Sequence, residues 1–297
     1  MMEGKYFMDN GNIKKKIKKN VNKTGFVFEY EVTNLLENYD WQVINSRYYM
    51  DIEYKKAREI DIIAYKSKQI DKIRYYTVLI ISCKKNEKSP FWVFYTKDIN
   101  KNDPNINFYP IYNWTNHKGL KYMLENKKYK NLITNNFNKK YIKNIYDINN
   151  QIFAFQEFDN KGNPQNDKNI YNSIITVINA YEYEKKELNN RKEEKCLYNF
   201  NLISLFKNKF FKIHFNGDVR AVNKVTNIKY INRHIFSNIE DYYRIHFITW
   251  EQFKNNDIND YNELYEWNND KYLNITNSFY DNIFKDYHKV YIYWDAF

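Results

Sequence analysis

The sequence predicts an α/β fold in which a central mixed sheet is flanked by helices and carries added helical segments. Two apolar runs rich in β-branched residues, 58–65 and 79–85, have polar residues at alternate positions, which is the pattern of strands. A third run, 25–38, has apolar residues at helical spacing. Together these runs predict a helix followed by two neighbouring strands.

The helix predicted at 25–38 carries a carboxylate on its apolar face. That face consists of Phe26, Val32, Leu35 and Leu36. Glu29 falls on the same face, because Val32 and Leu36 lie three and seven residues further on. A carboxylate on a buried face requires a partner. Glu31 and Glu37 lie off this face, and we expect them to be solvated.

The two strands place an acid and a lysine where they can meet. Glu59 and Asp61 share one face of the first strand, and Ser82 and Lys84 share one face of the second. The opposite face of the first strand is expected to consist of Ile60, Ile62 and Ala64. If residues 66–74 form a hairpin, the polar pairs converge at the strand ends. A carboxylate and a lysine in apolar strands are costly unless they pair or bind a metal.

These three elements resemble the PD-(D/E)XK nuclease superfamily, to which many restriction endonucleases belong. The shared features are a helix with a glutamate, a strand with Glu-x-Asp and a strand with x-x-Lys. The local sequences Gly-Phe-Val-Phe-Glu at 25–29, Arg-Glu-Ile-Asp-Ile-Ile-Ala at 58–64 and Cys-Lys-Lys through Pro-Phe-Trp-Val-Phe at 83–94 are similar to a branch of restriction-endonuclease-like proteins. The resemblance covers roughly the first third of the chain. It implies a restriction-endonuclease-like core.

The resemblance also implies roles for individual residues. Asp61 would bind a metal ion, Glu29 would complete the site from the helix, and Lys84 would position or activate the attacking water and offset charge on the scissile phosphate. The backbone carbonyl of Cys83 would add an oxygen ligand. Such an all-oxygen set suits Mg²⁺, with Mn²⁺ as an alternative.

One residue departs from the family pattern. The second acid of the motif, two positions before the lysine, is replaced by Ser82. A neutral hydroxyl is a poorer magnesium ligand than a carboxylate. Two interpretations stay open: Glu29 or Glu59 supplies the missing oxygen, or the fold keeps a nucleic-acid groove and has lost its chemistry. The presence of Asp61 and Lys84 together with Glu29 favours activity.

Composition indicates the class of partner. The 297-residue chain has a formal net charge of +11, which fits a polyanionic partner such as DNA or RNA. The family resemblance favours DNA over RNA. AT-rich codons encode Lys, Asn, Ile, Tyr and Phe, in which the chain is rich, so mutational bias can supply part of this charge. Two cysteines are too few for a disulfide framework or a zinc site, and neither a secretory leader nor a membrane-spanning apolar run occurs. We therefore expect a cytoplasmic protein with no membrane partner.

The chain is expected to contain a basic, flexible arm at 1–23 and a single nuclease domain at 24–297, with a polar insertion near 98–150. The arm has a lysine run without regular apolar spacing. Candidate nucleic-acid contacts are Lys14, Lys15, Lys16 and Lys85. Further along the chain, the patterns predict a strand at 152–155, a helix over 170–181, an Asn-Gly hairpin at 210–222 and a strand at 243–250. A similar series follows the motif region in the resembling proteins, and the resemblance therefore implies that these elements complete one sheet. The last aromatic run, 290–294, fits either a strand on the sheet or an interaction surface.

The function expected from these features is a Mg²⁺-dependent endonuclease acting on DNA in restriction or phage defence. Two alternatives remain beside it. One is a catalytically weakened nucleic-acid-binding module that retains the nuclease fold, and the other is a subunit that docks on a different protein. The expected protein partner is a second copy of the chain, forming a homodimer, or a partner defence protein.

Overall fold

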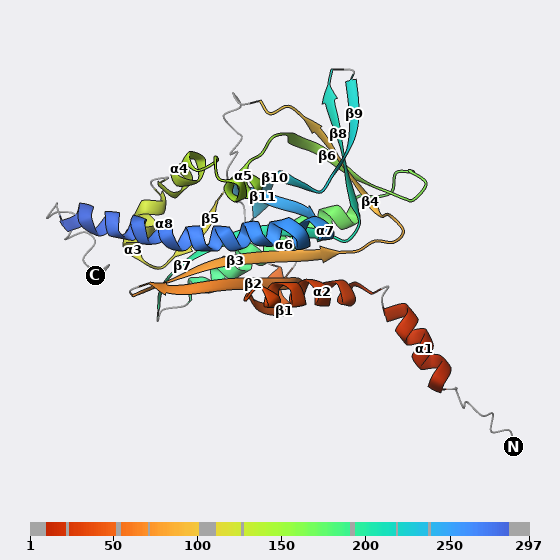
Figure 1. The fold of residues 1–297 in the computed structure, drawn as a ribbon, viewed down its shortest axis with the longest axis horizontal. Helices are drawn as coiled ribbons and strands as arrows, with labels where there is room; N and C mark the ends of the chain where they lie inside the picture. Colours follow the sequence, from red (N-terminus) through yellow and green to blue (C-terminus); the bar gives the residue numbers. More distant parts are fainter. Residues whose placement is uncertain are drawn as a thin grey trace.

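The computed structural model shows a mixed α/β protein with two open mixed sheets and several helices (Figure 1). The structure describes residues 10–21, 24–51, 55–70, 72–100, 111–125, 128–190, 194–217, 219–236 and 239–284. The predicted α/β class is confirmed. The predicted strand at 290–294 lies outside the described residues.

The larger sheet contains both motif strands. Its order is β1 (Gln42–Asp51), β2 (Lys56–Ile70), β3 (Ile73–Lys84), β7 (Lys195–Phe206), β11 (Ile239–Thr249) and β10 (Asn227–Phe236), and β5 (Tyr112–Thr115) also pairs with β7. β1, β2 and β3 are antiparallel, whereas β3, β7 and β11 run parallel. β3 and β7 are buried along almost their whole length. Their near-continuous apolar sequences are those of central strands covered on both faces.

The second sheet was not predicted. It has the order β6 (Gln151–Phe158), β4 (Phe91–Lys97), β8 (Lys209–Asn216) and β9 (Val219–Val225). The predicted hairpin is present as β8 and β9, with Gly217 at a φ of 58°, but the expectation that it completes the large sheet is wrong. The reason lies at the ends of β3 and β7. These parallel neighbours leave the large sheet together after the pair Lys84–Phe206, and pair again in the second sheet at Phe91–Lys209.

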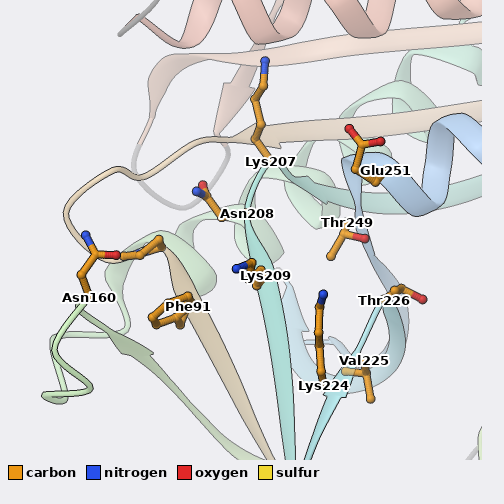
Figure 2. A pocket seen from close by; sticks show the side chains of 11 residues that line it. Phe91, Asn160, Lys207, Asn208, Lys209, Lys224, Val225, Thr226, Thr249 and Glu251 are labelled. Carbon is orange, nitrogen blue, oxygen red and sulfur yellow. The ribbon is translucent and has the colours of Figure 1, made fainter.

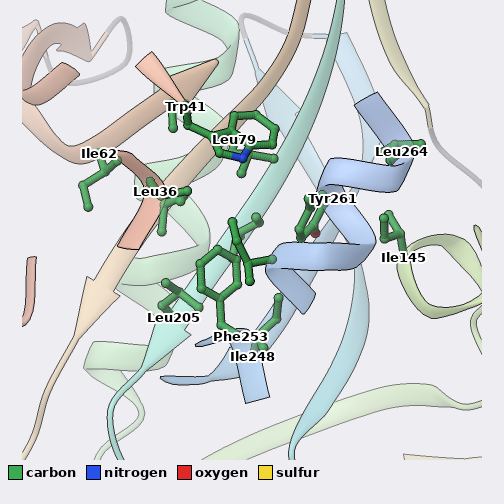
Figure 3. Close-up of a cluster of buried hydrophobic side chains, with 14 of the residues drawn as sticks. Leu36, Trp41, Ile62, Leu79, Ile145, Leu205, Ile248, Phe253, Tyr261 and Leu264 are labelled. Carbon is green, nitrogen blue, oxygen red and sulfur yellow. The ribbon is translucent and has the colours of Figure 1, made fainter. Parts of the chain in front are cut away.

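Helices cover the large sheet on both faces. One face carries α2 (Gly25–Asn38), α3 (Lys118–Glu125), α4 (Lys128–Asn135), α5 (Lys140–Tyr146), α7 (Trp250–Gln252), the π-helix η1 (Phe253–Asp257) and the long α8 (Ile258–Phe284). Figure 3 shows part of this core, where Leu36 of α2 and Phe253 of η1 approach Leu205 of β7. The other face packs against α6 (Lys168–Leu188) and the second sheet.

The predicted arm contains a helix, α1 (Asn10–Val21), that stands away from the sheets in Figure 1. Lys14, Lys15 and Lys16 are exposed on it. Ile17 and Val21 are also exposed, at 61% and 43%. With Ile13 they are spaced four residues apart, a regularity that the sequence analysis missed among the lysines. The polar insertion predicted near 98–150 contains β5, α3, α4 and α5 within its described part.

Candidate active site

Asp61 lies where β2 leaves its regular pairing with both neighbours. The β1–β2 pairs run through Asn45–Ile62 and resume at Arg47–Ile60, so Ser46 and Asp61 face each other across a gap in the ladder. Ser46 has a φ of 52°, which costs a non-glycine residue about 1–2 kcal/mol. On the other side, the β2–β3 pairs end at Ile62–Ile81. Such local breaks redirect a side chain out of the regular pleat.

The break changes which residues share a face. Ile62 and Ala64 pack in the core beneath α2, whereas Ile60 packs in the opposite core with Ile63. The expectation that Ile60, Ile62 and Ala64 lie on one face is therefore wrong at Ile60, because simple alternation does not hold across an interrupted strand.

One carboxylate oxygen of Asp61 is held by the end of β3. Its Oδ2 accepts hydrogen bonds from the backbone N–H of Cys83 at 2.6 Å and from Ser82 Oγ at 3.2 Å. Lys84 Nζ lies 3.6 Å from the same oxygen as an ion pair. No described residue donates a hydrogen bond to Oδ1. The carboxylate is thus fixed through one oxygen and offers the other to a ligand.

Glu29 approaches this group from α2. Partial burial raises the pKa of Glu29, the charge of Asp61 raises it further, Lys84 opposes the shift, and Glu59 adds to it. Glu29 therefore lies within electrostatic reach of all three predicted strand residues. The buried face of α2 is formed by Phe28, Val32, Thr33 and Leu36, and Phe26 is 72% exposed. The prediction that Phe26 lies on the buried face is therefore wrong, because Phe28 occupies that face.

Lys207 is a contributor that the sequence analysis missed. Its backbone N–H donates to the Lys84 carbonyl at 3.0 Å, and its ammonium group pairs with Glu31 and lies 5.3 Å from the centre of the Phe28 ring. Glu31, expected to be solvated, is an ion-pair partner. This bridge joins α2 to the end of β3 and so helps to hold Glu29 within electrostatic reach of Asp61. No local signal identifies Lys207, because only the β3–β7 pairing brings it here.

The oxygen atoms of Asp61, Glu29 and the Cys83 carbonyl fit a hard divalent cation whose remaining ligands would be water or phosphate oxygens. Asp61 Oδ1 is unclaimed, and Glu29 bears a second carboxylate whose repulsion from Asp61 a cation would relieve. The Cys83 N–H points towards Asp61, so its carbonyl faces the same strand edge. Burial raises the pKa of the Cys83 thiol, which leaves its carbonyl as the available ligand. Within the described ranges no three His, Cys, Asp or Glu side chains form a metal-holding group. Mg²⁺ commonly uses one or two carboxylates plus waters and phosphates.

The remaining candidates differ in placement. Ser82 is fully buried and points its hydroxyl at Asp61. Glu59 is exposed near the start of β2 and acts on Glu29 through its charge. Lys85 pairs with Glu87 at 3.0 Å and is only 16% exposed, so it is poorly placed to contact nucleic acid.

We expect Glu29→Gln to stabilise the metal-free protein at neutral and higher pH. A carboxyl whose pKa is raised by folding binds more protons in the native than in the unfolded state, so its contribution lowers stability as pH rises above its ordinary value of 4.5. Glutamine removes that penalty. Chemical denaturation without metal at pH 4 and pH 8 should show a difference from wild type at pH 8 that disappears at pH 4.

Glu37→Gln is the matched control, because Glu37 is exposed on the same helix. It should leave this pH dependence unchanged. Added Mg²⁺ should stabilise the wild type and the control more than Glu29→Gln. Equal behaviour of the two variants would contradict the placement of Glu29 in the site.

Comparisons with protein-family models, with curated proteins and with solved structures found no match. No helix in the described part of the chain has the length and apolar character needed to cross a membrane. The chemistry inferred for this protein therefore depends on the site itself.

Proposed function

We propose that the protein is a metal-dependent nuclease with a restriction-endonuclease-like core, hydrolysing phosphodiester bonds of DNA in restriction or phage defence. The observation that carries the proposal is the arrangement at Asp61. One of its oxygens is bound by the end of β3 beside Lys84, the other is unclaimed among the described residues, and Glu29 approaches from α2. The motif resemblance in the first third of the chain supports the same function.

Each residue has a chemical task in this proposal. Asp61 Oδ1, the Glu29 carboxylate and the Cys83 carbonyl would hold Mg²⁺, which lowers the pKa of bound water and neutralises charge on the phosphate. Lys84, held beside Asp61 and 25% exposed, presents its ammonium group to the attacking water or to a phosphate oxygen. Ser82 and the Cys83 N–H keep the Asp61 carboxylate oriented through Oδ2.

A second candidate is a nucleic-acid-binding module without hydrolysis. The observation in its favour is Ser82, which supplies a hydroxyl where the family pattern has a second carboxylate on the lysine strand. With fewer negative charges the site would bind Mg²⁺ less tightly. The two candidates differ in whether product forms, so one cleavage assay separates them.

Lys84→Gln is expected to reduce Mg²⁺-dependent cleavage by roughly 100-fold or more, as removal of a transition-state charge partner does. Labelled single- and double-stranded DNA and RNA should be incubated with the protein in Mg²⁺, in Mn²⁺ and in EDTA. Lys85→Gln is the matched control, because it removes the same charge from the next residue, whose ammonium group pairs with Glu87. It should retain cleavage close to wild type.

Equal cleavage by wild type and Lys84→Gln would indicate a contaminating nuclease. Salt-sensitive binding without product from any substrate would favour the binding module. Loss of activity in both lysine variants would mean that net charge, rather than the position of Lys84, controls the reaction.

A further inference from the structure

A basic pocket lies beside the candidate active site, at the junction of the two sheets. It has a volume of about 450 Å³ and is lined by residues of β4, the β7–β8 turn, β9 and the start of α7 (Figure 2). Its residue Lys207 is hydrogen-bonded through its backbone to Lys84. Lys209 begins β8, three residues beyond Phe206, which is the pairing partner of Lys84.

The charge available in this pocket is positive. Among the described residues Lys209 and Lys224 have no ion-pair partner, and both are exposed. Figure 2 shows the Lys224 side chain extending towards the space between Lys209 and Thr249, whereas Lys207 points away from them. The carboxylate of the pocket, Glu251, pairs with Lys254 at 3.1 Å. An anion entering the pocket therefore meets two uncompensated ammonium groups.

The pocket also offers an aromatic surface. Phe91 is partly exposed in the lining and makes an edge contact with Phe211, with ring centroids 5.6 Å apart. A phosphate for the lysines and a planar ring for Phe91 are together the features of a nucleotide. The volume is within the range of pockets that hold small ligands.

We propose that this pocket holds one nucleotide of the substrate strand, with its base against Phe91 and its phosphate between Lys209 and Lys224. The proposal rests on the nuclease function and adds a second anchoring point next to the bond that is cut. A strand held at both places presents the scissile phosphate to Asp61 and Lys84 in a fixed position. Binding in the pocket needs no metal.

The test measures binding of a fluorescent oligonucleotide in EDTA, so that cleavage cannot contribute. Lys209→Gln/Lys224→Gln should weaken binding roughly tenfold and, because the two lysines share one phosphate, reduce the slope of log affinity against log salt by about 0.7 for a single strand or 0.9 for a duplex. Phe91→Leu keeps an apolar side chain against Phe211 and should weaken binding roughly tenfold through lost stacking, with the salt slope unchanged.

The control removes the same charge from the far end of the large sheet, at exposed Lys68 and Lys195. Lys68→Gln/Lys195→Gln should change the affinity and the salt slope less than Lys209→Gln/Lys224→Gln does. Equal effects of both double variants would overturn the proposed nucleotide site, because they would show that the lysines act only through non-specific electrostatic attraction to nucleic acid. Equally tight binding of free deoxynucleoside monophosphate, abolished by Lys209→Gln/Lys224→Gln, would also overturn it in favour of a small-molecule site.

Failure of this proposal is distinguishable from failure of the proposed nuclease function. Metal-dependent cleavage that requires Lys84, with unchanged binding by the pocket variants, would reject the pocket alone. Pocket-dependent oligonucleotide binding without cleavage would retain the nucleotide site and reject hydrolysis.

Discussion

Asp61→Asn is expected to lower the Mg²⁺-dependent cleavage rate by more than about 100-fold, because even residues outside the direct ligand set of a metal commonly cost 10- to 100-fold. Asparagine retains an oxygen for the Cys83 N–H, so the hydrogen bond between β2 and the end of β3 should persist. It removes the negative charge that Oδ1 would offer to the metal and that pairs with Lys84. Cleavage and metal-free oligonucleotide binding should be measured on the same preparation.

The matched control is Asp98→Asn, since the Asp98 side chain is 78% exposed at the end of β4 and contacts His214. It should retain cleavage. Asp61→Asn should also lower the pKa of Glu29, because the Asp61 charge is one cause of its upward shift. Carboxyl-selective NMR titration can follow this change. Full activity in Asp61→Asn, or an unchanged Glu29 titration, would contradict the assignment of Asp61 to the site.

Local patterns were sufficient to locate the elements of the candidate site. The alternation and β-branched content at 58–65 and 79–85 predicted segments that lie in β2 and β3, and a short connection made them neighbours. Lys84 and Asp61 meet as expected because antiparallel pairing brings the end of one strand to the start of the other. These relations depend on residues close together in the chain.

The errors occurred where distant parts of the chain determine the structure. Phe28, rather than Phe26, is buried because Trp250 packs against its ring, with ring centroids 5.6 Å apart. The spacing of apolar residues within the helix cannot predict a contact with a residue so distant in the chain. The ion pair of Glu31 with Lys207 and the second sheet both depend on the parallel pairing of β3 with β7. A single sequence carries no marker for that pairing.

Ser82 illustrates how the structure changes the meaning of a sequence departure. Ser82 occupies the motif position where the family pattern has a carboxylate that binds metal. In this structure its buried hydroxyl donates a hydrogen bond to Asp61 Oδ2. A carboxylate there would face Asp61 in a buried position and repel it unless a cation lay between them. In the proposed nuclease Ser82 would orient the aspartate that binds the metal, and Glu29 would supply the second negative charge.

Trp92→Ala is expected to reduce the free energy of unfolding by about 3–5 kcal/mol, the usual cost of truncating a buried tryptophan. Trp92 is fully buried on β4 of the second sheet. Its ring stacks on Phe206 of the large sheet at 4.1 Å and makes an edge contact with Phe247 at 6.0 Å. It therefore fills the joint between the sheets, and alanine would leave a cavity there. Urea denaturation at neutral pH would measure the loss.

Two controls distinguish the loss of the Trp92 contact between the sheets from the loss of any apolar side chain. Phe153→Ala removes a ring that is 52% exposed on β6 and should cost less than about 1 kcal/mol. Trp92→Phe should cost less than Trp92→Ala, since it keeps a ring and removes an indole N–H that has no partner among the described residues. Because Phe206 is the pairing partner of Lys84, Trp92→Ala should also weaken cleavage under conditions where the protein remains folded. A loss below about 1 kcal/mol would show that the two sheets do not depend on this contact.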